Sequence, residues 1–217
     1  MALNKQKLKL AEAHFLQRYP GGFANPEMQA IGKKHRVDKM TALAQESFSE
    51  IALGNINVST QNMVKVVSRS SMVSMFEKPK FRDFVGCLNT GDREFMVKSL
   101  EQMLHGQQQA GFEAMVDILQ TGKLAKWSIL TIIPAYFSPT VDVFVKPTTA
   151  KNVIRHFEVE ELFYKPLPSW SFYTGYRDLI NSAKRQVYSG LSPSNAAFSG
   201  FLMISMGQLF TEPVLSK

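Results

Sequence analysis

An acid and a lysine stand close together in a segment rich in β-branched residues, SPTVDVFVKPTTAK, residues 138–151. In an extended strand, Asp142 and Lys146 would lie on one face because their separation is even. Nuclease folds of the restriction-enzyme type use an acid and a lysine to hold a metal ion and activate water. Those folds need the two groups two residues apart, whereas here they are four apart. The spacing therefore favours a strand with polar ends over a nuclease centre.

A second candidate lies in the segment RHFEVEE, where His156, Glu158 and Glu160 alternate. An extended backbone would aim all three side chains at one side, which could begin a divalent-metal site. The stretch follows a helical pattern, however, and the sequence places no further ligand beside it. We predict no metal site and no cofactor. A metal-dependent hydrolase or nuclease using Asp142, Lys146, Glu158 and Glu160 is kept as the alternative function.

Other catalytic templates are missing from the sequence. It contains no G-x-S-x-G elbow, no G-x-x-x-x-G-K-[ST] phosphate loop and no G-x-G-x-x-G turn after a strand. The single cysteine, Cys87, excludes an internal disulfide and a Cys-rich zinc site, and its apolar neighbours predict a buried, inert thiol. Together with the lack of a signal-peptide pattern, this cysteine usage predicts a cytoplasmic protein.

Positive charge is concentrated near the start of the chain. Residues 1–82 hold 13 Lys or Arg and 6 Asp or Glu, whereas residues 83–217 hold 12 of each. Such an asymmetry is typical of proteins that meet a polyanion, although a solvated basic face also serves solubility. The candidate contact residues are Lys33, Lys34, Arg36, Lys39, Lys65, Arg69, Lys78, Lys80 and Arg82.

The spacing of apolar residues predicts a mainly helical fold. Helices are expected over residues 4–18, from 26 to about 51 with a break near Gly32, and over 63–73, 81–88, 96–104, 112–119, 148–157, 176–187 and 193–210. Two segments rich in β-branched and aromatic residues, 141–147 and 161–168, predict a small two-stranded β element. The apolar runs at 127–137 and 198–210 are shorter than the roughly 20 residues of a membrane span, so they are expected in the core.

These patterns predict one domain over residues 1–217, with a helical half at 1–122 and a mixed half at 123–217. The leading functional hypothesis is a non-enzymatic binding protein whose basic N-terminal half contacts nucleic acid or an acidic protein. Self-association into a homo-oligomer is a third hypothesis, because the last predicted helix is apolar on nearly every face.

Overall fold

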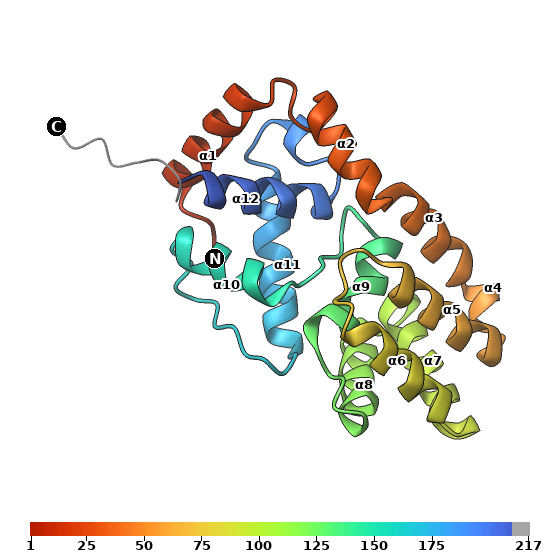
Figure 1. Ribbon diagram of the computed structural model, residues 1–217. Helices are drawn as coiled ribbons and strands as arrows, with labels where there is room; N and C mark the ends of the chain where they lie inside the picture. Colours follow the sequence, from red (N-terminus) through yellow and green to blue (C-terminus); the bar gives the residue numbers. More distant parts are fainter. Residues whose placement is uncertain (210–217) are drawn as a thin grey trace.

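The structure is a computed structural model that describes residues 1–209, and every regular element in this range is a helix (Figure 1). The elements are α1 (Lys5–Arg18), η1 (Gly22–Ala24), α2 (Pro26–His35), α3 (Val37–Ser47), α4 (Glu50–Leu53), α5 (Ile56–Arg69), α6 (Glu77–Cys87), α7 (Thr90–His105), α8 (Gln108–Thr121), α9 (Trp127–Phe137), α10 (Pro147–His156), α11 (Trp170–Lys184), η2 (Ser189–Leu191) and α12 (Asn195–Leu209). The mainly helical prediction is confirmed.

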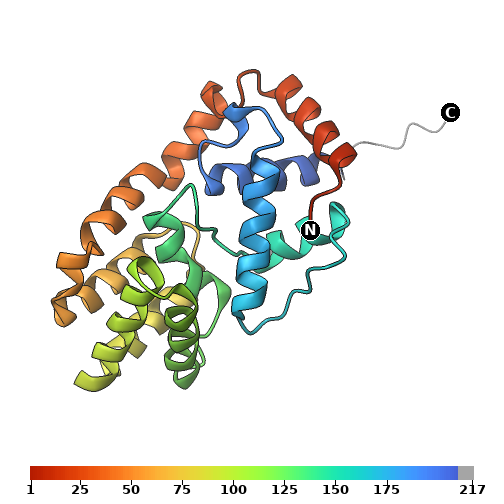
Figure 2. The same ribbon diagram turned by 180° about the vertical axis from the view of Figure 1, so that it is seen from behind.

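The helices form two groups that do not follow the order of the chain. In the first group, α1 packs on α12, which also contacts α10 and α11. The second group contains α3 to α9, and α11 extends from α12 to α8 and so connects the groups (Figure 2). The start of the chain is tied to its later part, because the Asn4 amide donates to the Phe157 carbonyl at 3.0 Å.

The second group is built around α9. Each residue from 127 to 136 is buried, because α3, α5, α7 and α8 all pack against this helix. The apolar run that the sequence placed in the core is therefore its most completely enclosed helix. Pro134 lies inside α9 and is tolerated near its end, since the helix stops at Phe137.

Side-chain caps define where many helices begin. The side-chain oxygens of Asn4, Asn25, Asn55 and Asn89 accept backbone N–H groups in the first turns of α1, α2, α5 and α7. A cap of this kind satisfies amides that have no partner within the helix. The cap at Asn55 explains why α5 begins at residue 56, in a stretch that apolar spacing alone treats as a loop.

The predicted two-stranded β element is wrong for the described residues. Residues 141–146 and 161–168 are irregular, although Val143 and Val145 are fully buried. Their backbone groups bond to side chains in place of a partner strand: the Val145 amide donates to Thr131 Oγ1 at 3.0 Å, and the Lys165 carbonyl accepts from Trp127 Nε1 at 2.8 Å. Apolar, β-branched composition thus reports burial here and not strand pairing.

Two smaller expectations also need correction. The break in the second helix lies at Arg36, whose φ of 51° places it in the left-handed region, and not near Gly32. Cys87 is exposed, because it ends α6 on the side away from Phe81 and Val85. The last residue of the predicted helix 193–210 lies outside the described residues. Within residues 1–209, no helix is both long and apolar enough to cross a membrane.

Thr131 provides a test of how the irregular segment is held. Replacing this fully buried residue by valine leaves the Val145 amide without an acceptor, and an unsatisfied buried amide costs about 1–3 kcal/mol. We expect Thr131→Val to lower the free energy of unfolding by that amount in a urea titration.

The matched control is Thr60→Val in α5. The Thr60 hydroxyl is also buried but only donates to the carbonyls of Ile56 and Asn57, so valine leaves no amide unsatisfied. We expect this change to cost less than about 1 kcal/mol. Equal losses at the two positions would contradict the role given to Thr131.

Candidate functional site

The predicted basic residues lie on or beside four helices, α2, α3, α5 and α6. Four of them stand at the end of α2 and the start of α3, two on α5 and three on α6. Because α3 packs on α5 and α5 on α6, these helices form one layer, which Figure 1 shows with α2 in line with α3. We call this set the basic surface: Lys33, Lys34, Arg36, Lys39, Lys65, Arg69, Lys78, Lys80 and Arg82.

Cations of the basic surface are exposed and mostly not paired with acids. All are exposed except Lys78, which is half-buried. Arg82 forms an ion pair with Asp83 at 2.9 Å; for the other eight, no carboxylate among the described residues lies within 4 Å. Asp38 also lies within this stretch of sequence and is exposed. Eight positive charges are therefore available to a ligand.

A polar contact connects the cations at the end of α2 with those on α5. His35, the last residue of α2, has its Nδ1 atom 2.9 Å from Ser71 Oγ in the segment after α5. Lys33, Lys34 and Arg36 are thereby held near the end of α5, where Arg69 lies. Lys65 and Arg69 are neighbours on α5 because they are four residues apart.

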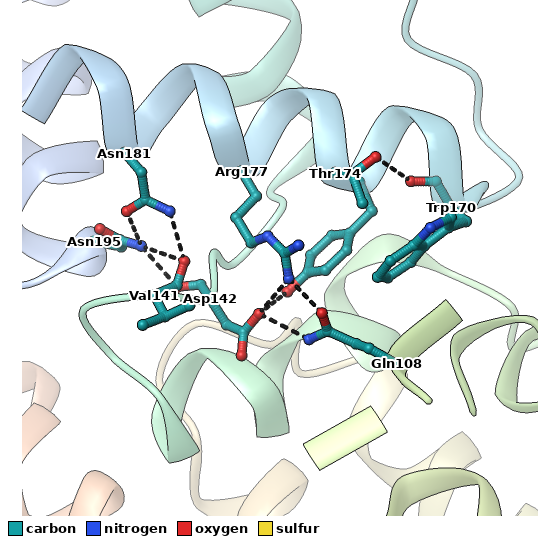
Figure 3. Close-up of polar contacts among 9 residues, drawn as sticks. Gln108, Val141, Asp142, Trp170, Thr174, Arg177, Asn181 and Asn195 are labelled. Atoms are coloured by element: carbon teal, nitrogen blue, oxygen red, sulfur yellow. Dashed lines mark hydrogen bonds and ion pairs between the residues drawn. The ribbon is translucent and has the colours of Figure 1, made fainter. Parts of the chain in front are cut away.

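The second polar cluster surrounds Asp142, which is buried between the two helix groups (Figure 3). Its Oδ1 atom accepts from the Tyr173 hydroxyl at 2.9 Å, from Arg177 Nη1 at 3.2 Å and from Gln108 Nε2 at 3.3 Å. Arg177 Nη1 also donates to Gln108 Oε1 at 2.6 Å. The carboxylate thus links α8, α11 and the segment between α9 and α10.

The remaining contacts of this cluster hold the backbone of residues 140–142. Asn181 donates to the Val141 carbonyl at 2.8 Å, and Asn195 donates to the carbonyls of Val141 and Asp142, both at 3.0 Å. Lys184 Nζ donates to the Thr140 carbonyl at 2.6 Å. Figure 3 shows Trp170, Thr174, Arg177 and Asn181 in succession along α11. These contacts anchor a connecting segment and leave few polar groups for a ligand.

Burial and neighbouring charge shape the ionisation of this cluster. The pKa of the Tyr173 hydroxyl is raised well above its ordinary value, first by burial and then by the negative charge of Asp142. Burial lowers the pKa of Lys184, with a smaller contribution from the charge of Arg185. The Arg177 guanidinium lies 5.7 Å from the Trp170 ring centroid and 5.4 Å from that of Tyr173, so it makes cation–π contacts with both rings.

The acids predicted for the hydrolase alternative do not come together. Glu158 is exposed and accepts from Lys7 and from Asn4, both at 2.7 Å, and these hydrogen bonds lower its pKa. Lys146 and Glu160 are exposed. Within residues 1–209, no group of three or more His, Cys, Asp and Glu side chains is placed to hold a metal ion. The alternative needs a convergence of carboxylates that these residues do not provide.

His156 completes the pattern with Glu158 and Glu160, for which the sequence predicted no metal site. It ends α10 and is partly buried, and its pKa is lowered, first by burial and then by the positive charge of Lys7. Its ring lies 4.8 Å from that of Phe157, edge to face. This environment favours a neutral imidazole packed against the helix end.

The residues that surround Asp142 were not found from the sequence. Tyr173, Arg177, Asn181 and Lys184 recur at spacings of four, four and three residues, which places them on one face of α11. This polar stripe lies beside the apolar face from which the helix itself was predicted. Its periodicity could have indicated that α11 contacts a polar segment, although not which one.

Asp142→Asn tests the importance of the charge in this cluster. The substitution leaves Arg177, whose side chain is only 17% exposed, without its counter-charge. Removing one partner of a buried ion pair usually costs 3–5 kcal/mol, and the partial exposure of Arg177 reduces this to roughly 2–4 kcal/mol. We expect that decrease in the free energy of unfolding, measured in urea.

Glu158→Gln is the matched control, because it makes the same chemical change in an exposed pair with Lys7. Exposed pairs contribute little, so this variant should unfold close to the wild type. A wild-type stability for Asp142→Asn would contradict the importance of the buried pair.

Tyr176 gives a prediction about pH. This residue is buried, and burial raises the pKa of its hydroxyl well above the value near 10 of an unfolded chain. The folded protein therefore favours the neutral phenol. The associated stability is present below pH 10 and is lost as the pH rises above 10, at about 1.4 kcal/mol per pH unit.

Tyr176→Phe removes this ionisation. Between pH 8 and pH 11, the variant should lose about 1.4 kcal/mol less free energy of unfolding than the wild type. The measurement is a urea titration of both proteins at the two pH values. An equal loss in both would show that the phenol ionises as easily in the fold as in the unfolded chain.

Comparisons of the chain with protein-family models, with curated proteins and with solved structures gave no match. The function must therefore be inferred from the two clusters themselves. One of them, around Asp142, uses its polar groups internally, whereas eight of the nine cations of the basic surface have no carboxylate partner within residues 1–209.

Proposed function

We propose that this protein binds nucleic acid through the basic surface. The observation that carries the proposal is the gathering of eight exposed or half-exposed cations, none with a carboxylate within 4 Å among the described residues, on the layer formed by α2, α3, α5 and α6. Exposed cations that have no internal partner can neutralise phosphates and release the counterions condensed on them. This release is a large part of the affinity of nucleic-acid-binding proteins.

The type of surface supports nucleic acid over an acidic protein. The cations come from several helices and not from a single turn, as expected for a ligand that carries charges at regular intervals. Exposed Ser68 and Ser71 stand among them, and hydroxyl groups commonly donate to phosphate oxygens. An acidic protein would satisfy the same charges, and competition by a polyglutamate peptide distinguishes it.

The proposed function is binding and not catalysis. Asp142 is paired with Arg177 and Glu158 with Lys7, and Glu160 is exposed. Residues 1–209 contain no group of three or more His, Cys, Asp or Glu side chains placed to hold a metal ion. A surface that contacts phosphates through Lys and Arg fixes position and orientation without reading base sequence. We therefore expect binding with little sequence preference.

Neutralising five of these cations tests the proposal. The variant combines Lys33→Gln, Lys34→Gln, Lys65→Gln and Arg69→Gln with Arg36→Asn, because asparagine tolerates the left-handed backbone at residue 36. Each phosphate contact contributes about 0.7–0.9 to the slope of log K against log salt. We expect the slope measured by fluorescence anisotropy with a labelled 20-mer to fall by up to about four.

The control removes the same amount of charge from the other part of the protein. It combines Lys146→Gln, Lys151→Gln, Arg155→Gln, Lys165→Gln and Arg185→Gln, all at exposed positions. This variant should keep the wild-type affinity and salt slope to within a small factor. The proposal fails if both variants weaken binding equally, or if the wild type does not bind the oligonucleotide at low salt.

A further inference from the structure

Two large apolar side chains project into solvent close in sequence to the lysines of α6 in the basic surface. Met75 and Phe76, just before α6, are each 79% exposed. Lys78 and Lys80 follow two and four residues after Phe76, and Ser74 precedes the pair. An exposed apolar pair is a candidate ligand contact. The lysines that follow it in the sequence favour a ligand that also carries negative charge.

The backbone at this point is held in a defined turn. The Phe76 amide donates to Ser74 Oγ at 3.3 Å, and the amides of Glu77 and Lys78 donate to the Ser74 carbonyl at 3.0 and 3.3 Å. The next side chain, Glu77, points inward, where it accepts from Ser128 Oγ at 2.6 Å and pairs with Lys126 at 3.5 Å. The turn therefore presents Phe76 to solvent on a fixed support.

A nucleic-acid single strand offers the chemistry that this arrangement would recognise. Its unpaired bases have open faces that stack on aromatic rings, and its phosphates follow cationic side chains. In a duplex the faces of the bases are covered by their neighbours, so an exposed ring gains little from them. Ser74, two residues before the ring, supplies a hydroxyl group, which suits phosphate oxygens better than the acyl chains of a membrane.

We infer that Phe76 is a stacking platform for an unpaired base, and that the basic surface prefers single-stranded nucleic acid to duplex. This inference rests on the proposed function. The lysines at 78 and 80 hold the phosphates on either side of the base, while the turn at Ser74 keeps the ring in place before the strand arrives. A ring that is already positioned loses little conformational freedom on binding.

The experiment uses the full chain, a fluorescein-labelled 20-mer of oligo(dT) and a 20-base-pair duplex with the same label, at one fixed salt concentration. The variants are Phe76→Ala, Phe76→Trp and Met75→Ala. Met75→Ala is the matched control because Met75 and Phe76 are equally exposed but only Phe76 has an aromatic face. Thermal unfolding should be the same for all variants, since both side chains lie in solvent.

Phe76→Ala is expected to weaken binding of the single strand by about 5- to 100-fold, the effect of losing one stacked base. Its affinity for the duplex should change by less than about twofold. Phe76→Trp should retain the affinity for the single strand, and the fluorescence of the new tryptophan should be quenched when oligo(dT) binds. Met75→Ala should bind the single strand within about twofold of the wild type.

Three outcomes overturn the inference. If Phe76→Ala binds oligo(dT) as tightly as the wild type while the five-cation variant does not, stacking is excluded and the proposed function stands. If the wild type binds neither oligonucleotide, the proposed function fails as well. If Phe76→Ala and Met75→Ala lose the same affinity, and both also lose binding to phosphatidylserine vesicles that the wild type shows, the turn contacts an anionic lipid surface instead.

Discussion

The arrangement of the two helix groups depends on one buried carboxylate. Asp142 lies in the irregular segment between α9 and α10, and its Oδ1 atom accepts hydrogen bonds from Tyr173, Arg177 and Gln108. A charge buried in this way is tolerated only when it is paired and hydrogen-bonded. The contacts with Arg177 and Gln108 therefore fix α8 against α11, where the two groups of helices meet.

The polar groups around Asp142 and the cations of the basic surface have different environments. Polar groups between the helix groups are used to satisfy one another, including Lys184 and Asn195, which hold the backbone of residues 140–142. Among the cations of the basic surface, only Arg82 pairs with a carboxylate within residues 1–209. We propose that these cations and the exposed Phe76 contact the ligand, whereas the polar groups around Asp142 stabilise the fold.

The sequence predicted most of the helices because burial of one apolar face leaves a clear period, as for Leu8, Ala11 and Phe15 in α1. It failed for residues 141–146, where alternating burial of Val143 and Val145 looks the same whether the backbone pairs with a strand or with side chains. Only the fold brings Thr131 to the Val145 amide. The grouping of α1 with α12 likewise depends on contacts between distant segments, which no local pattern contains.

The candidate site was predicted in part. The cations were identified by counting charged residues along the sequence. This works because lysines and arginines are usually exposed wherever they occur. Asp142 was singled out for a reaction, yet its counter-charge, Arg177, lies 35 residues away on another helix. Phe76 escaped notice because nothing in its local sequence distinguishes an exposed phenylalanine from a buried one such as Phe81.

Mapping the bound single strand by NMR tests the central claim most directly. Backbone amide shifts are recorded for the isotopically labelled protein as oligo(dT) is added. The account predicts that the largest changes occur in residues 33–39 and 65–82, with small changes around the exposed lysines at 146, 151 and 165. Changes centred on residues 146–165, or spread evenly over the surface, would contradict it.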